Sequence, residues 1–332
     1  MAKEIGRLHS FWVWIEAIAG TPASIDTWIP LEEGNLKPII EIVKDESAIW
    51  VIEWASDSHV TKTSSEFTAK GIVRSKSFPW VLFATLWTCW APSLVETWVY
   101  THAMTRLNSN SHPACTVIHD NTTQEEQASY CMVDSLKLAF EIWSQAKFDL
   151  KMMGKLFANT TGNTPTFVTL DEPFLVSNMC VKFASTVAGL TGATPVPVQS
   201  VNFEIAKNLN QIYSTSTTCG TEVLNFASQH NQQMDITGDM EIIYDADTYK
   251  TLAIANTQQA IWITITGKTL IGATKYNQLT FVFANTRLED WDRSMSNNEI
   301  VSQTFGFSSM YSVGDTSSIS ATVQNTISAQ YA

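Results

Sequence analysis

Residues Ile261–Ile265 read Ile-Trp-Ile-Thr-Ile, and residues Leu279–Phe283 read Leu-Thr-Phe-Val-Phe. Nearly every side chain in these two runs is β-branched or aromatic, and such side chains favour strands because they pack well on a pleated surface. The first half of the chain contains a similar pair of alternating runs, Leu136–Phe140 and Phe148–Met152. We therefore predict a mainly β chain in which each half contains such a pair of neighbouring strands.

The first half of the chain reappears, in the same order, in the second half. Three further segments have counterparts: Phe11–Glu16 in Asn178–Phe183, Pro38–Asp45 in Ser200–Asn208, and Phe67–Val73 in Met234–Met240. Each copy then carries a helical stretch, Trp80–Leu86 or Thr248–Ala255. The sequence thus predicts two tandem α+β units, each a sheet with one helix, at residues 1–166 and 167–332. A repeated unit with unsatisfied sheet edges usually pairs them with further copies, which points to a function in assembly.

The two copies differ in two respects. The first copy is longer, and Val99–Leu107 and Pro113–Ile118, separated by turn-forming residues, predict an extra hairpin at about 88–128. Each copy also contains a long polar stretch without core periodicity, Ala55–Ser65 and Ser214–Thr221. Loops of this length are usually functional or mobile, and a hairpin tip without function is the alternative.

Charge and composition narrow the class of protein. The formal net charge is −12, and this argues against a protein that grips nucleic acid through its phosphates. It does not exclude a protein past which DNA slides, because an acidic wall repels phosphates. Charged residues are only 16%, and the chain has 12 Trp, which suit either a core or protein–protein contacts.

No catalytic, cofactor or metal site is predicted, and we do not expect an enzyme. The five cysteines are widely spaced, odd in number and without a CxxC pair, which favours reduced thiols over zinc ligands or disulfides. The six histidines are scattered, and Asp245 and Asp247 suit the start of a helix better than a calcium loop. The apolar run Phe78–Trp90 contains proline and is too short to span a membrane.

Several segments carry a resemblance to a known family. They are Gly20–Pro22 and Trp28–Gly34, Asp45–Ala48, Thr61–Gly71, Tyr100–His102 followed by Pro113–Val117, Val198–Asn208, Ile236–Glu241, Asp245–Ala255, Asn298–Phe307 and Ile319–Asn325. Their order resembles that of the tail tube proteins of long-tailed bacteriophages, in the version that fuses two tube domains in one chain. The resemblance covers nearly the whole chain and rests on the order and duplication of the features.

The resemblance implies that each half is a twisted β-sandwich or split barrel with a flanking helix. Three chains would form a homotrimeric, pseudo-hexameric ring whose inner sheets join edge to edge into one β-barrel. Rings would stack into a helical assembly, the tail tube, and double-stranded DNA would pass through its lumen during ejection. Barrel closure removes unpaired edges, and cyclic symmetry closes a ring, so the implied assembly is physically consistent.

The same resemblance implies that the polar stretches 55–65 and 214–230 are arms that reach the next ring, with help from the N-terminal segment and Thr316–Ala332. The candidate arm residues are Ser56, Asp57, His59, Thr61, Lys62, Ser64, Thr215, Thr217, Thr221 and Asn225. The implied partners are further copies of the chain and the tape measure, terminator and baseplate proteins, with no membrane. The implied location is the phage tail, assembled in the cytoplasm of the host bacterium.

A second hypothesis comes from a different class. A Trp-rich carbohydrate-binding or adhesive β-sandwich would use exposed aromatic rings to stack on sugars. It predicts a soluble monomer whose Trp variants lose their ligand, whereas a tube protein predicts rings or filaments.

Overall fold

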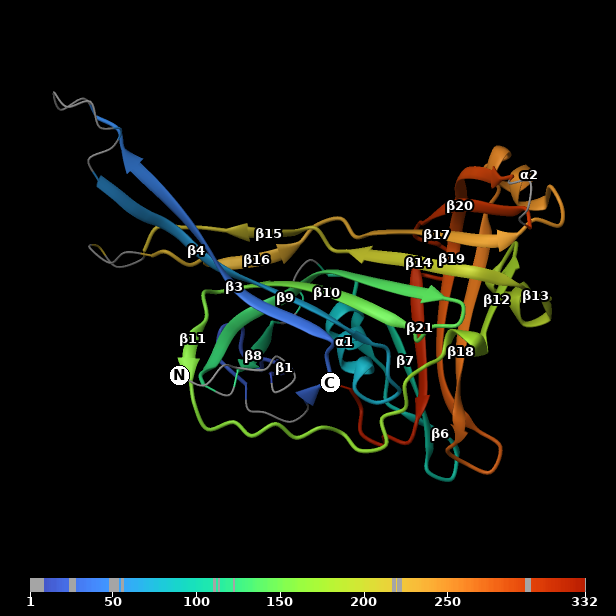
Figure 1. Ribbon diagram of the computed structural model, residues 1–332, viewed down its shortest axis with the longest axis horizontal. Coiled ribbons are helices and arrows are strands. Elements are labelled where there is room, and N and C mark those ends of the chain that lie inside the picture. The colour runs from blue at the N-terminus through green and yellow to red at the C-terminus, as the bar shows by residue number, and fades with distance from the viewer. Residues whose placement is uncertain are drawn as a thin grey trace.

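The computed structural model describes residues 9–23, 28–47, 54, 57–109, 112, 114–121, 123–216, 219, 223–295 and 300–331. The protein is mainly β, as the sequence predicts, and elongated, with two hairpins projecting at one end (Figure 1). The first half contains β1 (Ser10–Ile15), β2 (Trp28–Ile29), β3 (Glu33–Asp45), β4 (Asp57–Ile72), α1 (Phe78–Leu86), β5 (Trp87–Cys89), β6 (Ser93–Glu96), β7 (Val99–Arg106), β8 (Cys115–Asp120), β9 (Glu125–Glu141), β10 (Lys147–Gly154) and β11 (Ala158–Thr160). The second half contains β12 (Met179–Ala184), β13 (Pro195–Val196), β14 (Val198–Ala206), β15 (Leu209–Ile212), β16 (Ser228–Asn231), β17 (Asp235–Ile243), α2 (Thr248–Ile254), β18 (Gln259–Leu270), β19 (Tyr276–Ser294), β20 (Ser302–Ser309) and β21 (Ile319–Asn325), with short 3-10 turns at Val176–Asn178 and Val187–Gly192.

A central sheet of eight strands runs through both halves. Its order is β3-β4-β10-β9-β14-β17-β20-β19, and every neighbouring pair is antiparallel. The halves meet where β9 pairs with β14, from Glu141 opposite Ser200 to Ser135 opposite Ala206. Seven antiparallel steps separate the two outer strands, so β3 and β19 run in opposite directions.

The long strands β9 and β19 each leave the central sheet and enter a second sheet. The N-terminal part of β9 pairs with β8 and β11, and β8 leads on to β1 and β2. The N-terminal part of β19 pairs with β18 and β21, and β18 leads on to β12 and β13. The two halves therefore repeat one pairing pattern, in which β8, β9, β10 and β11 correspond to β18, β19, β20 and β21.

This pattern both confirms and corrects the sequence comparison. The predicted strand pairs form, with Leu138 opposite Phe148 and Ile263 opposite Phe281. Their predicted equivalence is wrong by one strand, because β9 corresponds to β19 and not to β18. The strands β5–β7 are inserted before β8 in the first half only, and the shared alternation of the strands cannot reveal such a shift.

The predicted extra hairpin at about 88–128 is right in placing additional strands there but wrong in its pairing. Its two strands exist as β7 and β8, but β7 pairs with β5, β6 and β21, and β8 pairs with β1 and β9. The turn-forming residues between them connect two different sheets. Turn residues end a strand without determining which strand pairs next.

The core lies on one face of the central sheet, between it and the two side sheets. Phe148 lies over Gly71 and Phe307 over Gly238, and a Cβ at Gly238 would come within 2.5 Å of the Asn202 carbonyl oxygen and the Phe307 ring. Helix α1 begins with proline in its first turn, where no N–H is required, and it is buried on nearly every side. Both predicted helices are confirmed, as α1 and α2.

Two adjacent acidic residues tie the connection between the halves to both of them. Asp171 accepts hydrogen bonds from the Lys76 backbone N–H, at 2.7 Å, and from the Ser77 hydroxyl, at 2.5 Å, at the start of α1. Glu172 accepts from the backbone N–H groups of Lys268 and Thr269 at the end of β18, at 2.6 and 2.9 Å. The two halves are thus held in one orientation by neighbouring side chains.

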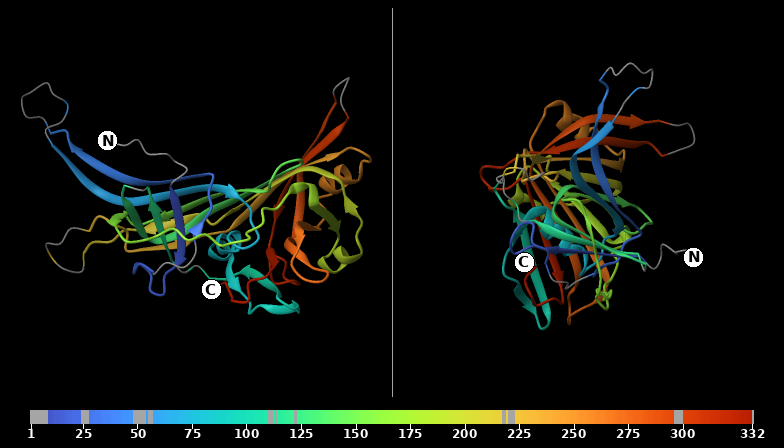
Figure 2. Two further views of the ribbon diagram at one scale, coloured as in Figure 1. Left: turned by 60° about the horizontal axis from the view of Figure 1, so that its bottom comes forward. Right: turned by 90° about the vertical axis from the view of Figure 1, so that its left-hand side faces the viewer.

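The C-terminal segment, expected to act between rings, is packed within its own chain. Strand β21 pairs with β7 of the first half, from Ser320 opposite Thr105 to Asn325 opposite Tyr100. Tyr331 is 1% exposed and lies between Trp80 and His102, with ring centroids 5.0 and 4.7 Å away. The second half therefore completes the first, and the C-terminus lies beside strands of the first half (Figure 2).

Candidate functional site

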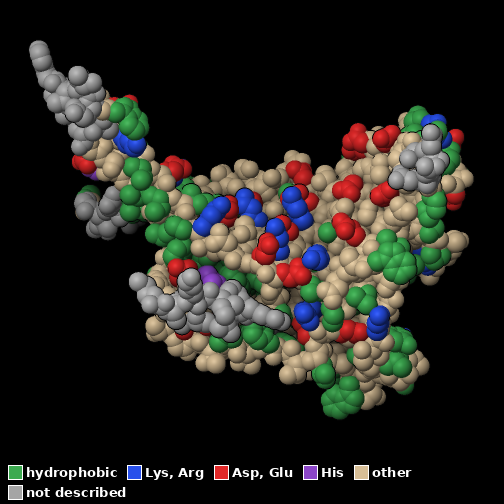
Figure 3. Space-filling view, in the orientation of Figure 1, with side chains coloured by type: hydrophobic (Ala, Val, Ile, Leu, Met, Phe, Trp, Pro, Cys, Tyr) green, Lys and Arg blue, Asp and Glu red, His purple; other side chains and the backbone are tan. Residues whose placement is uncertain are grey.

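One face of the central sheet is polar, and Figure 3 shows Lys, Asp and Glu side chains gathered across it. Successive side chains of a strand point to opposite faces, so Lys147, Asp149 and Lys151 of β10 lie here while Phe148 and Leu150 enter the core. The same alternation operates in the neighbouring strands. This face is therefore the polar side of the central sheet.

A row of directly opposed residues crosses all eight strands on this face. Its members are Glu33, Lys70, Asp149, Lys137, Glu204, Thr237, Ser308 and Arg287. The charges alternate in sign over the first five, and the Lys137 Nζ lies 3.3 Å from the Glu204 Oε2 across the junction of the halves. Opposite charges that face each other across strands stabilise a sheet by roughly 0.2–1 kcal/mol per pair.

The lysines beside this row are also paired with carboxylates. The Glu66 carboxylate forms ion pairs with the Lys37 Nζ, at 2.6 Å, and the Lys151 Nζ, at 3.6 Å. The Lys151 Nζ also lies 3.1 Å from the Asp134 carboxylate. Burial alone would raise the pKa of Glu66, but the two lysines outweigh burial and lower it. The Glu66 carboxylate is therefore charged at neutral pH, and the lysine charges around it are compensated.

The second half contributes mostly carboxylates to the polar face. Asp235, Asp239 and Glu241 of β17 and Glu289 of β19 lie on it. The Asn202 side-chain amide donates to Asp239 at 2.9 Å. Because the lysines of the first half are held by carboxylates and the second half adds further acids, the whole face presents net negative charge, which repels phosphates.

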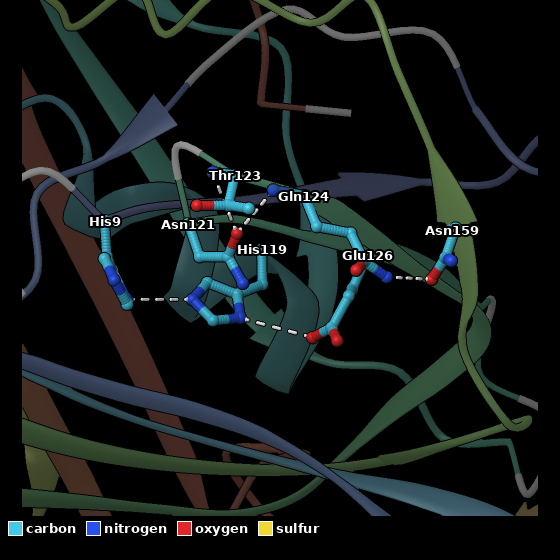
Figure 4. A network of polar contacts seen from close by, with 7 residues as sticks. All are labelled: His9, His119, Asn121, Thr123, Gln124, Glu126 and Asn159. Atoms are coloured by element: carbon cyan, nitrogen blue, oxygen red, sulfur yellow. Dashed lines mark hydrogen bonds and ion pairs between the residues drawn. The ribbon is translucent and has the colours of Figure 1, made fainter. Parts of the chain in front are cut away.

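A polar network around His119 is present in the described part of the chain. No group of His, Cys, Asp and Glu there could hold a metal ion. Figure 4 shows a polar network in which the His119 Nε2 lies 3.2 Å from the His9 Nδ1 and the His119 Nδ1 lies 3.5 Å from a Glu126 oxygen. Burial lowers the pKa of His119, although Glu126 opposes this effect. The network links β8 to β9 and to the start of β1.

Within the described ranges, no helix combines the length and the apolar character needed to cross a membrane.

The β3–β4 hairpin extends beyond the rest of the central sheet. Strand β4 pairs with β10 only from Ser65 to Ile72, whereas its pairing with β3 continues to Asp57. Residues 57–64 therefore overhang by about 27 Å at 3.4 Å per residue. Residues 57–65, which the sequence suggested as a loop, are strand. Over 57–61 both faces of the projecting hairpin are exposed, so no core periodicity is required there, and residues 63–65 at its base are buried.

Five candidate arm residues fall within this overhang, and four of them lie away from its base. Asp57, His59 and Thr61 are exposed, and Lys62 is half-buried. The Lys62 Nζ lies 2.8 Å from the Glu41 carboxylate, which raises the pKa of Lys62. Beside these polar groups β3 presents apolar side chains to solvent; Ile40, Ile42 and Val43 are each about half exposed.

The other candidate arm residues are placed differently. Ser64 is only 4% exposed and lies at the base of the overhang, where the neighbouring Thr63 N–H donates to the Leu224 carbonyl oxygen at 2.8 Å. Asn225 accepts a hydrogen bond from the Thr63 hydroxyl, so it joins the connection between β15 and β16 to the base of the β3–β4 overhang. Thr215 is exposed in the connection after β15. Ser56, Thr217 and Thr221 lie outside the described residues.

The β15–β16 hairpin projects from the same end of the sheet. The hairpin follows the Ala206 end of β14, and Ala206 lies opposite Ser135 of β9. The turn from β9 to β10 comes after Glu141, which is at the other end of the same strand pair. The overhang of β4 likewise begins beyond Gly154, the end of β10 that is farthest from that turn. Both hairpins are therefore on one end of the strands, and the β9–β10 turn is on the other (Figure 1).

The central sheet has two open edges. All described pairs of β3 are made with β4. On the other side, the pairing of β19 with β18 ends at Thr286, and residues 287–294 pair only with β20 in the part of the chain that is described. Such rows of unpaired N–H and C=O groups are templates for pairing with another chain.

The two polar stretches of the sequence mark the segments that form the hairpins, but the charged row was not predicted. The signal was present as a charge alternation of period two at Lys147-Phe148-Asp149-Leu150-Lys151. Its meaning depends on the register with β4 and β9, which only the structure supplies.

A family model described as phage tail tube protein matches residues 55–309, about three quarters of the chain. No curated protein matches the chain.

Proposed function

Because the chain belongs to the phage tail tube protein family, we propose that it is the major subunit of a tail tube whose lumen conducts DNA during ejection. Each half, divided at residues 166 and 167, is one tube domain. Three chains form a pseudo-hexameric ring, the rings stack, and other tail proteins such as the tape measure, terminator and baseplate proteins bind the finished tube. The tube is built in the host cytoplasm and remains part of the phage tail.

The observation that carries this proposal is the repetition of one junction. Within the chain, β9 pairs with β8 as far as Cys131 and then with β14 from Ser135 onward. Strand β19 corresponds to β9 and pairs with β18 as far as Thr286, after which that side is open. The strand that residues 287–294 of β19 lack as a neighbour should be the counterpart of β14. That counterpart is β3, because β3 pairs with β4 as β14 pairs with β17.

A second copy can supply this neighbour. If β3 of one chain pairs with residues 287–294 of the next, the junction between chains repeats the junction between halves. The new pair is antiparallel, like every other pair of the central sheet, because β3 and β19 run in opposite directions. Repeating the step closes a barrel and leaves no edge.

The polar face would then line the lumen. Its lysines are compensated by carboxylates, and β17 and β19 add Asp239, Glu241 and Glu289. A negative wall keeps the phosphates of passing DNA from adhering, which a conduit requires. The opposite face of the sheet is already filled by the core, so only this face can be wet.

Electron microscopy of the purified chain, combined with sedimentation, tests the proposal. We expect rings or tubes with a central channel and a sedimentation coefficient far above that of a 36.9 kDa monomer. A persistent monomer that binds glycans through its exposed tryptophans would contradict it and favour the carbohydrate-binding alternative.

A further inference from the structure

The two open edges of the central sheet carry charges that can select one register between chains. Residues of β19 that lie on the polar face are Arg287, Glu289, Asp292 and Ser294, since a bulge between Glu289 and Asp292 adds one residue. The residues of β3 on that face include Asn35, Lys37, Ile39 and Glu41. The inference rests on the proposed ring, in which these residues of β19 face these residues of β3 of the next chain.

We propose that β19 of one chain pairs with β3 of the next so that Arg287 lies opposite Glu41 and Asp292 lies opposite Lys37. In this register Glu289 faces Ile39 and Ser294 faces Asn35. All of residues 287–294 then find a strand partner, because β3 extends from Glu33 to Asp45.

Charge is the first argument for this register. Lys37 lies 2.6 Å from Glu66, and Lys62 lies 2.8 Å from Glu41, both on the neighbouring strand β4. The new contacts would extend these pairs into alternating rows, in the manner of Lys70, Asp149, Lys137 and Glu204 inside the chain.

The neighbouring registers are less favourable. A shift of two residues toward the hairpin tip places Glu289 against Glu41, and directly opposed like charges destabilise a sheet. A shift of two residues the other way retains a single complementary pair, Glu289 with Lys37, and opposes Ser294 to Glu33. The proposed register alone makes two complementary contacts without a like-charge contact.

Barrel geometry is an independent argument. Strands of a closed barrel tilt by 35–45°, so a row that runs perpendicular to the strands climbs by about one residue per strand. Over eight strands it arrives about eight residues away from where it began. The row starts at Glu33 and ends at Arg287. Arg287 should therefore face a residue of the next chain that is about eight positions from residue 33, either 41 or 25. Residue 25 precedes β3, which leaves residue 41.

Cross-linking tests the register directly. The chain with Glu289→Cys and Ile39→Cys should form disulfides between neighbouring chains in oxidised rings, because directly opposed Cβ atoms are close enough for a disulfide. The matched control carries Glu289→Cys with Glu41→Cys and should cross-link at least tenfold less. The unaltered chain, with its own five cysteines, gives the background.

A charge exchange gives a second test. Arg287→Glu should raise the concentration needed for ring assembly about fivefold, and the row exchange Arg287→Glu with Glu41→Lys and Lys62→Glu should restore it. Arg293→Glu is the control, because Arg293 lies over the Tyr244 ring on the other face. Melting curves of the dissociated variants show whether each still folds.

The outcomes separate the two proposals. Cross-links from residue 289 to residue 41 in preference to residue 39, or an unaltered assembly of Arg287→Glu, would overturn the register while rings still form. If the unaltered chain forms no rings, the proposed function and the register fall together.

Discussion

Lys207 and His112 are buried ionisable side chains near the end of helix α1. Lys207 is 1% exposed, and its Nζ lies 3.5 Å from the Ala84 carbonyl oxygen in the last turn of the helix, where a cation is favourable. Burial lowers the pKa of Lys207 to about 7. Burial, with Lys207 and Arg106 nearby, lowers the pKa of His112 to about 4. Both groups therefore make the folding free energy depend on pH.

The pH dependence has a definite sign at each group. In the unfolded chain His112 has a pKa near 6.5, so between pH 6.5 and 4 the unfolded state binds a proton that the folded state does not. The free energy of unfolding should therefore fall by roughly 3 kcal/mol as the pH is lowered from 6.5 to 4. For Lys207 stability should rise between pH 7 and 10.5. Chemical unfolding at a series of pH values measures both slopes. His112→Gln should flatten the acid branch, and an unchanged acid branch would contradict this assignment.

Trp143 occupies a strained backbone position. It has a φ of 67° in the turn after β9, where the Ser144 N–H donates to the Glu141 carbonyl oxygen, and its side chain is 87% exposed. A bulky residue costs about 1–2 kcal/mol in this left-handed region, and glycine does not.

Trp143→Gly should therefore raise the free energy of unfolding of the dissociated chain, by about 0.5–1 kcal/mol after allowing for the greater entropy of unfolded glycine. Trp98, with a φ of 65° and 73% exposure in the β6–β7 turn, offers a matched variant, Trp98→Gly, with the same expected sign. Urea titration measures both. A loss of stability in both variants would show that the exposed rings are held by contacts that the strain argument ignores.

At the scale of elements, the C-terminal segment is a structural part of the first half. The Asn325 side-chain amide donates to both the Tyr331 hydroxyl and the Ser75 carbonyl oxygen, at 2.8 Å each. Burial raises the pKa of Tyr331, which keeps its hydroxyl neutral. The tyrosine therefore fills a cavity and anchors the strand that joins the two halves.

Tyr331→Ala should lower the free energy of unfolding by about 3–5 kcal/mol, as expected for removing a large buried ring. Tyr331→Phe, which retains the ring and loses the hydrogen bond, should cost about 1 kcal/mol. Equilibrium unfolding of both variants is the measurement. Equal, small losses in the two would mean that the tail is not docked as described.

The elements themselves were predictable where composition determined them. The β-branched and aromatic runs Ile261–Ile265 and Leu279–Phe283 are strands in β18 and β19, because each buries one side in the core. Residues 57–65 gave no such signal, since 57–61 are exposed on both faces and the buried residues 63–65 are polar. The pairing of β7 with β21 was inaccessible to local reasoning, because the partners are more than 200 residues apart.

At the scale of the whole molecule, the projecting β3–β4 hairpin should join rings and contribute little to the fold. Glu41 lies opposite Lys62, so residues 42–61 can be replaced by an Asn-Gly turn between these two residues. We expect this variant to fold and to form rings that no longer stack, because the exposed apolar side chains of Ile42 and Val43 are gone. Electron microscopy and sedimentation compare it with the full chain, and normal tubes from the variant would refute the arm assignment.

The sequence indicates which segments form the proposed site, but not which of their side chains share a face. The duplication and the polar stretches were visible, so an assembling protein with two hairpins could be predicted. Which side chains share a face depends on registers such as Lys137 opposite Glu204, and a shift of one residue would move every charge to the core side. Asn225, a candidate arm residue, lies in the connection between β15 and β16 and accepts a hydrogen bond from Thr63 of β4, which sequence order alone does not indicate.

Both hairpins emerge from one end of the strands, and the β9–β10 turn occupies the other. A stack of such subunits is a polar filament, with unlike faces at its two termini. Incoming subunits would meet hairpins at one terminus and their receptor surface at the other, so elongation has a direction. In the proposed tube, one kind of initiator would therefore suffice at the base and one kind of cap at the top, and neither could substitute for the other.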